Sequence, residues 1–194
     1  MAGFDPNQPR DEEGKWTEVE NAARYTAGLG SSIQQIVDST QIGDEFVELG
    51  KISVIAYRTG SIDPGHERGI FFGNTPEAIK DYESLHANEP VKEYQITTGN
   101  TIAAKDVRSL YQQLYKKRLD LNAIDDAHKF NSPAKALRWA EARVARTLTA
   151  RGFDSAILSA PFNAPPELWI FPKNKSTIRQ AVQARIEKGD IPKG

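Results

Sequence analysis

From Lys51 onward, short segments rich in β-branched and aromatic residues alternate with longer segments that carry an apolar stripe. Segments of the first kind predict strands, whereas apolar positions at spacings of three and four predict helices. Strands are predicted over residues 52–57, 70–72, 91–97, 154–158 and 167–171. The alternation therefore limits the chain to a mixed fold, which we assign to the α+β class.

The predicted helices have recognisable ends. A helix is predicted to begin at Thr75-Pro76 and another at Ser132-Pro133. The hydroxyl group caps the first turn, and proline fits there because its missing N–H would have no partner within the helix. Gly152 ends the helix that begins at Ser132. Helices are predicted over residues 75–85, 105–121, 132–151 and 175–186.

The chain has 194 residues, enough for one globular domain and a modest extension. Residues 1–50 are predicted to form an N-terminal extension that is partly flexible, with short helices near residues 18–27 and 31–37. Residues 51–190 are predicted to form the main domain. No apolar run approaches the roughly 18 residues of a transmembrane helix, so we expect no membrane partner.

The charge is unevenly distributed along the chain. The 25 basic and 26 acidic residues give a net charge of −1, which disfavours a generally polycationic nucleic-acid binder. Residues 1–104 carry 8 basic and 17 acidic side chains (−9), and residues 105–194 carry 17 and 9 (+8). One face built from the C-terminal half is thus a candidate for an anionic partner, unless the basic residues only solvate long helices.

Several chemistries are excluded by what the sequence lacks. Without cysteine there is no disulfide, thiolate nucleophile or cysteine-ligated metal. The histidines, His66, His86 and His128, are never paired at metal-ligand spacing, so no metal site is predicted. Neither a phosphate-binding loop nor the glycine pattern of doubly wound dinucleotide folds is present.

Two charged residues at predicted strand ends are candidates for a site. Arg58 closes a strand before Thr59-Gly60, where its guanidinium can fork onto phosphate or ribose oxygens and the glycine permits close approach. Glu167 opens a very apolar strand after Pro165-Pro166, which holds a carboxylate at the edge of the core. Solvated strand ends are the alternative for both residues.

Phe71 lies on a predicted strand and Tyr82 on the helix that follows it. Two such aromatic side chains can sandwich a flat ring, although ordinary core packing explains them equally well.

The charged and aromatic candidates lie within a series of short motifs, whose order and spacing resemble those of the mono-ADP-ribosyltransferases, more narrowly the small phage and prophage members. The likeness covers about residues 51–180. Its motifs are Tyr57-Arg58-Thr59-Gly60, Gly69-Ile70-Phe71-Phe72-Gly73-Asn74-Thr75-Pro76 continuing to Tyr82, Gly152-Phe153-Asp154-Ser155-Ala156-Ile157, and Glu167-Leu168-Trp169-Ile170-Phe171-Pro172. Residues 7–16 separately resemble a segment of phage head-morphogenesis proteins.

The resemblance implies a split β-sandwich of two small sheets with flanking helices, and an NAD-dependent ADP-ribosyltransferase. Such an enzyme cleaves the nicotinamide–ribose bond and transfers ADP-ribose to a host macromolecule, with a protein as the expected acceptor. The implied catalytic residues are Glu167, Arg58 and Tyr82. The implied NAD-binding residues are Tyr57, Arg58, Thr59, Gly60, Phe71, Phe72 and Tyr82.

Two departures from the family bear on these expectations. Pro165 stands where arginine-modifying members carry Glu or Gln, and Phe71-Phe72-Gly73-Asn74 replaces a Ser-Thr-Ser strand. An arginine acceptor is therefore in doubt, and an inactive NAD-binding protein stays open. The location implied is the host bacterial cytoplasm, with packaging in the virion left open.

The alternative is a non-enzymatic phage protein, either a virion component or an inhibitor of a host nucleoprotein machine. It would use a basic helical face, for which Lys116-Lys117-Arg118 and the group of Lys135, Arg138 and Arg146 are the candidates. Direct nucleic-acid binding is disfavoured by the net charge but stays open.

Overall fold

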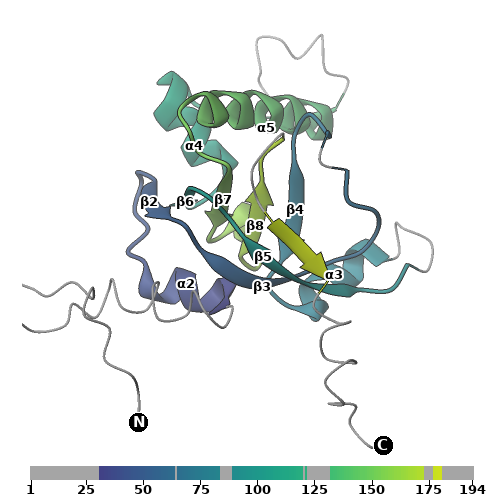
Figure 1. The fold of residues 1–194 in the computed structure, drawn as a ribbon. Coiled ribbons are helices and arrows are strands. Elements are labelled where there is room, and N and C mark those ends of the chain that lie inside the picture. Colours follow the sequence, from purple (N-terminus) through teal and green to yellow (C-terminus); the bar gives the residue numbers. More distant parts are fainter. Residues whose placement is uncertain are drawn as a thin grey trace, which may run out of the picture.

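A computed structural model of the chain describes residues 31–63, 65–83, 89–119, 121, 132–172 and 177–180; for 80–83 and 177–180 it describes the backbone alone. Within this part of the chain, nine strands join into one curled sheet (Figure 1). The strand order is β2-β6-β7-β8-β4-β3-β5-β9, and β1 pairs with β3. The prediction of an α+β fold is confirmed.

The strands that the pattern predicted are all present, with ends shifted by a residue or two. The five predicted strands correspond to β3, β4, β5, β7 and β8. All strands within the described residues are β1 (Ser31–Ser32), β2 (Val47–Gly50), β3 (Ser53–Arg58), β4 (Ile70–Gly73), β5 (Lys92–Thr97), β6 (Thr101–Ala104), β7 (Ser155–Leu158), β8 (Glu167–Ile170) and β9 (Thr177–Gln180).

The helices within the described residues are α2 (Ile33–Ser39), α3 (Pro76–Glu83), α4 (Val107–Tyr115) and α5 (Pro133–Ala150). The predicted caps precede α3 and α5, whereas the caps of α2 (Ser32) and α4 (Asp106) were not predicted. The Ser132 hydroxyl accepts a hydrogen bond from the Lys135 amide at 3.3 Å, and Asp106 accepts one from the Ser109 amide at 2.8 Å. These bonds satisfy amide groups that a helix leaves unpaired in its first turn.

The predicted helix over residues 175–186 is wrong for 177–180, which form β9. This strand pairs antiparallel with β5, with Ile178 opposite Ile96. The spacing of apolar residues here suits a helix, but the segment pairs with the edge of the sheet at β5 instead, because tertiary pairing outweighs local helix propensity. Residues 181–186 lie outside the described residues.

The sequence pattern predicted no regular structure for β2 and β6, which pair with each other. Residues 31–50, which we expected in the extension, contribute β1 and β2 to the sheet and α2 to one of its faces. The helix predicted near residues 31–37 is confirmed for residues 33–37 as part of α2 but is wrong for Ser31 and Ser32, which form β1. Residues 18–27 lie outside the described residues.

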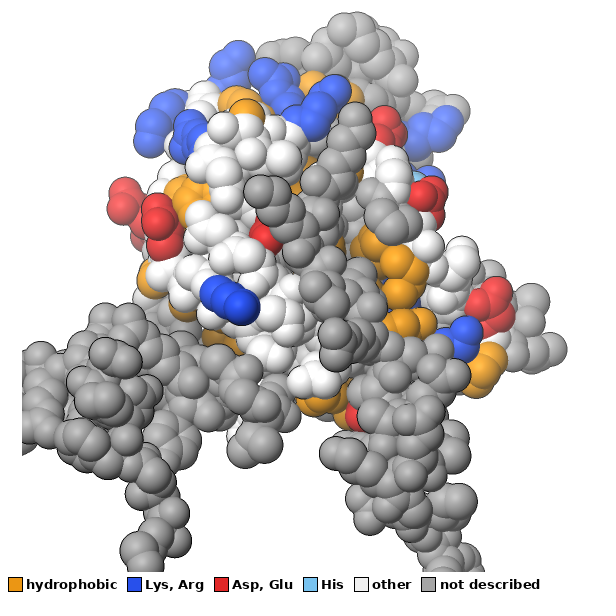
Figure 2. All heavy atoms as spheres, viewed as in Figure 1, with side chains coloured by type: hydrophobic (Ala, Val, Ile, Leu, Met, Phe, Trp, Pro, Cys, Tyr) orange, Lys and Arg blue, Asp and Glu red, His pale blue; other side chains and the backbone are white. Residues whose placement is uncertain are grey.

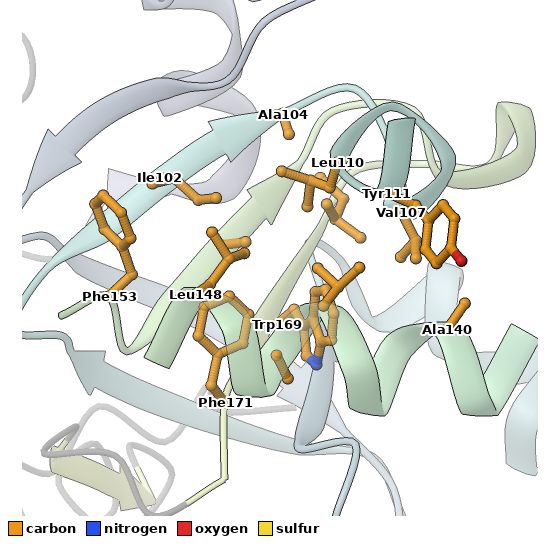
Figure 3. Packing of buried hydrophobic residues seen from close by; sticks show 14 of the residues in the cluster. Ile102, Ala104, Val107, Leu110, Tyr111, Ala140, Leu148, Phe153, Trp169 and Phe171 are labelled. Atoms are coloured by element: carbon orange, nitrogen blue, oxygen red, sulfur yellow. The ribbon is translucent and has the colours of Figure 1, made fainter. Parts of the chain in front are cut away.

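The sheet separates two hydrophobic clusters. The helix-pair face carries α4 and α5, which pack on β6, β7 and β8 through the first cluster (Figure 3). The opposite face carries α2, whose Ile33 and Ile36 are buried against β3, β4 and β5 in the second cluster. Successive residues of a strand point to opposite faces, so Trp169 belongs to the first cluster while Leu168 belongs to the second.

Strands β3 and β4 meet at a narrow seam. Tyr57 opposite Gly73 is the one paired position between them, whereas β3 pairs with β5 at six positions. The two strands therefore diverge at the centre of the sheet. Strands β7, β8, β4 and β3, which carry the four motifs named above, are consecutive in the sheet.

Candidate active site

Glu167 begins β8 on the helix-pair face of the sheet. It lies opposite Gly73 of β4, and two residues farther along Trp169 lies opposite Phe71. Because directly opposite residues point to the same face, Glu167, Trp169 and Phe71 share that face. Trp169 and Phe71 form an aromatic row on this face. Trp169 is fully buried and Phe71 is partly exposed, so the row is accessible to solvent at Phe71.

The loop before β4 is held tightly against β8. Gly69 has a φ of +81°, and a Cβ there would overlap the carbonyl oxygen of Ile170, so only glycine fits. Beside it, the indole Nε1 of Trp169 donates a hydrogen bond to the carbonyl oxygen of Arg68 at 2.6 Å. These two contacts fix the backbone from which the Arg68 side chain extends.

Arg68 joins the aromatic row to an acidic residue of α5. Its Nη1 forms an ion pair with Oε2 of Glu141 at 3.2 Å, and its Cζ is 5.7 Å from the centroid of the Phe71 ring. Phe71 in turn stacks on Trp169, with centroids 5.2 Å apart and planes 11° from parallel. The Arg68 side chain is 32% exposed and that of Glu141 is 9% exposed, so the pair is partly shielded from water.

The charge of Glu141 influences the ionisation of Glu167. Burial, followed by the negative charge of Glu141, raises the pKa of Glu167 to about 7, while Arg68 acts in the opposite direction. Burial also raises the pKa of Glu141, and Arg68 and Arg138 oppose that rise. Arg68 forms its ion pair with Glu141, and its positive charge also acts on Glu167, whose pKa of about 7 allows it to bind a proton near neutral pH.

Arg58 lies on the other face, at the seam. Its position in β3 points it toward the second cluster, and its Cζ is 6.0 Å from the centroid of the Phe72 ring. Nη1 donates to the carbonyl oxygen of Phe71 at 2.9 Å and Nη2 to that of Ser61 at 3.4 Å. Its buried Nε has no acceptor among the described residues. Burial lowers the pKa of Arg58, the nearby Tyr94 opposes this, and the positive charge of Arg68 lowers it further.

The structure therefore places Glu167 and Phe71 on the same face of the sheet, whereas Arg58 lies on the other face and is linked to Phe71 by its hydrogen bond to the Phe71 carbonyl oxygen. Phe72 is fully buried in the second cluster, edge-to-face with Tyr94, and is not accessible to a ligand in this conformation.

The remaining predicted residues lie around the seam. The Tyr57 hydroxyl donates to Oε2 of Glu93 at 3.0 Å. Thr59 and Gly60 follow β3 and are buried. Tyr82 belongs to α3, and its side chain lies outside what the structure describes.

Arg68 and Glu141 were not predicted from the sequence. Arg68 had a weak signal, because it stands directly before a glycine and a Phe-Phe strand. Glu141 had a clearer one, since it is the sole acidic residue in the basic helix α5 and adjoins the buried position Ala140. Its contact with Arg68 spans 73 residues, a separation that local pattern does not address.

Metal chemistry finds no support in the described part of the chain, where no group of three or more His, Asp or Glu side chains could hold an ion. The helices described there include none with the length and apolar character of a membrane span.

The site is thus defined by the half-buried Glu167 and by the ion pair of Arg68 with Glu141, both of which act on its ionisation. Its description rests on the geometry of this chain alone. Comparison of the chain with protein-family models, curated proteins and solved structures finds no match.

Proposed function

We propose that the protein is a mono-ADP-ribosyltransferase that cleaves the nicotinamide–ribose bond of NAD and transfers ADP-ribose to a host protein. The observation that carries the proposal is the environment of Glu167, a half-buried carboxyl group beside Arg68 and an accessible Phe71. The adjacency of the strands that carry the four motifs supports it, and so does the divergence of β3 from β4, at which a sheet of this family would split.

The reaction breaks the bond between the ribose C1′ and the nicotinamide nitrogen. The bonding electrons leave with nicotinamide, which departs as a neutral ring, and C1′ acquires positive charge. An ionised Glu167 stabilises that charge most strongly in the transition state, when the charge appears. Partial burial strengthens the effect, because little water competes with the carboxylate. The acceptor then bonds to C1′ and releases its proton to solvent.

The two arginines receive different roles in this proposal. Arg68 is the guanidinium beside Glu167 and Phe71, so it is available to a phosphate or ribose oxygen of NAD. Arg58 donates to the Phe71 carbonyl across the seam and acts as a positioning residue for the Phe71 strand. The Phe71 ring lies between Trp169 and Arg68 and is partly exposed, so its exposed part is available for contact with nicotinamide.

The elevated pKa of Glu167 has a direct consequence for activity. Since the ionised form is the one that stabilises a cation, nicotinamide release should rise as pH increases through about 7. A rate that falls over the same interval would contradict the assigned role.

The test compares Glu167→Gln with Glu48→Gln, a matched change at an exposed glutamate of β2. We expect Glu167→Gln to reduce release of labelled nicotinamide by about 100-fold or more, and Glu48→Gln to leave it unchanged. With adenine-labelled NAD and host lysate, the wild type should label a protein and Glu167→Gln should not. Equal turnover by the two variants would refute the proposal.

A further inference from the structure

The helix-pair face of the molecule has a strongly basic outer surface. Residues 105–119 and 132–151, which contain α4 and α5, carry ten basic side chains and two acidic ones, a balance of +8. All ten are exposed, and we call them the basic face. Figure 2 shows lysine and arginine side chains gathered over α4 and α5. The basic face consists of Lys105, Arg108, Lys116, Lys117, Arg118, Lys135, Arg138, Arg143, Arg146 and Arg151.

The two acidic residues of this region do not neutralise it. Asp106 caps α4, where its carboxylate accepts the Ser109 amide. Glu141 is buried beneath α5 and paired with Arg68. Within the described residues, no member of the basic face forms an ion pair with a carboxylate. The other side chains that the structure describes include 4 basic and 11 acidic ones, a balance of −7, so the described part of the molecule is electrically polarised.

The face offers little apolar surface for a protein partner. Among the described residues, Phe162 is the large hydrophobic residue that is exposed, at 43%, and the guanidinium of Arg108 covers it at 4.8 Å from the ring centroid. Arg143 similarly lies 4.5 Å and 5.2 Å from the ring centroids of Tyr115 and Trp139. Stable protein interfaces depend on buried apolar or aromatic anchors, which this surface lacks.

A phosphate backbone needs no such anchor. It is bound by repeated contacts from Lys and Arg, and the arginine fork matches two phosphate oxygens. Helix α5 has 18 residues and therefore spans about 27 Å, the length of about eight base pairs of a duplex. Lys135, Arg138 and Arg146 lie on one exposed side of this helix, so several phosphates can be contacted together.

We propose that the basic face binds the phosphate backbone of double-helical nucleic acid without sequence preference. The duplex form is favoured because stacking of unpaired bases needs free faces of aromatic rings, and an arginine guanidinium already lies over the rings of Phe162, Tyr115 and Trp139. The negative remainder of the molecule would orient it, with α4 and α5 toward the duplex. This binding is independent of NAD and of Glu167.

The test measures binding of a fluorescent 30-base-pair DNA duplex by anisotropy, at salt concentrations from about 50 to 200 mM, without NAD. The first variant is Lys135→Glu/Arg138→Glu/Arg146→Glu, and the second is Lys117→Glu/Arg118→Glu. Lys116 is left intact because its left-handed backbone, with φ of 55°, ends α4. Lys51→Glu, at an exposed lysine outside the basic face, is the control.

We expect the triple variant to bind at least about 30-fold more weakly at 50 mM salt and to reduce the slope of log affinity against log salt by about 2 to 3. The double variant should lose about 10-fold, and Lys51→Glu less than 2-fold. Circular dichroism and thermal melting verify that each variant is folded. Glu167→Gln should bind as the wild type does, so a failure of the catalytic proposal leaves this result untouched.

Three results would overturn the proposal. The first is equal duplex affinity in the wild type and the triple variant. The second is competition by polyglutamate as effective as that by unlabelled duplex at equal charge, which would indicate an acidic protein partner. The third is tighter binding of single-stranded DNA than of the duplex.

Discussion

The two faces of the central sheet use neighbouring residues for different purposes. Phe72 points to the α2 face, where it is fully buried among aliphatic side chains. Phe71, the residue before it, points to the helix-pair face and keeps part of its ring accessible beside Arg68. The alternation of a strand thus gives one dipeptide both a core residue and a site residue.

The difference also extends to charge. On the helix-pair face, Glu141, Glu167 and Arg68 lie together with incomplete neutralisation. On the α2 face, Arg58 is the charge near the second cluster, and backbone carbonyls serve as its acceptors. Burial shifts the pKa of groups on both faces, lowering that of Arg58 and raising those of Glu167 and Glu141. The helix-pair face differs in bringing two carboxyl groups close to one arginine beside a partly exposed ring, the arrangement on which the proposed function rests.

The largest effect expected from this comparison is on stability. Phe72→Ala removes a fully buried ring and should lower the free energy of unfolding by about 3–5 kcal/mol. Phe71→Ala removes a partly exposed ring and should cost about 1–2 kcal/mol, since less apolar area leaves contact. Urea unfolding of the two variants measures the difference.

NAD turnover should reverse that order when compared at a temperature at which both variants are folded. Phe71→Ala is expected to lose nicotinamide release, whereas folded Phe72→Ala should retain most of it. Equal losses of stability, or loss of turnover in Phe72→Ala alone, would contradict the division between the two faces.

The sequence predicted the elements of the fold better than their partners. Proline and hydroxyl caps located α3 and α5, because capping is a property of a few adjacent residues. Strand β9 was missed, since its position depends on β5, some 80 residues earlier. Strand β6 was also missed: Thr101–Ala104 is short and becomes a strand by pairing with β2 and β7.

The same limit applies to the site. Glu167 could be singled out because two prolines and an apolar strand surround it in the sequence. Its partners Arg68 and Glu141 could not, since only the crossing of α5 over β4 and β8 brings them near it (Figure 1). Arg58 was correctly predicted at a strand end. The side of the sheet that it faces follows from the pairing of β3 with β5, in which Arg58 lies opposite Lys92 and Ala56 opposite Tyr94.

A smaller effect on the free energy of unfolding is expected when the Glu167 carboxyl group on the helix-pair face is replaced by an amide. The pKa of Glu167 is raised from its ordinary 4.5 to about 7, so the folded protein holds a proton more tightly than the unfolded chain. Its contribution to stability is complete below pH 4.5 and is lost as pH rises through 7. Glu167→Gln escapes that loss because it cannot ionise.

Glu167→Gln should therefore match the wild type in stability below pH 4.5 and exceed it above pH 7. The full shift corresponds to at most about 3 kcal/mol, which screening of a half-buried group reduces to about 1–2 kcal/mol. Thermal melting from pH 4 to pH 9 measures the divergence, with Glu48→Gln as the exposed control. Parallel curves for wild type and Glu167→Gln would show that the carboxyl group is not held in a desolvated position.

The smallest expected effect is on the pKa of Glu167, and it differs between variants of Arg68 and Arg58. Arg68 lowers the pKa of Glu167, so Arg68→Met should move that pKa upward from about 7. Arg58 faces the other cluster, and Arg58→Met should leave the pKa in place while it weakens the seam at the Phe71 carbonyl. The shift should be below about one unit, because the Arg68 side chain is 32% exposed and solvent screens it. Carboxyl NMR titration of Glu167 in both variants resolves a change of that size. A larger shift in Arg58→Met than in Arg68→Met would place the functional arginine on the α2 face and reverse the comparison.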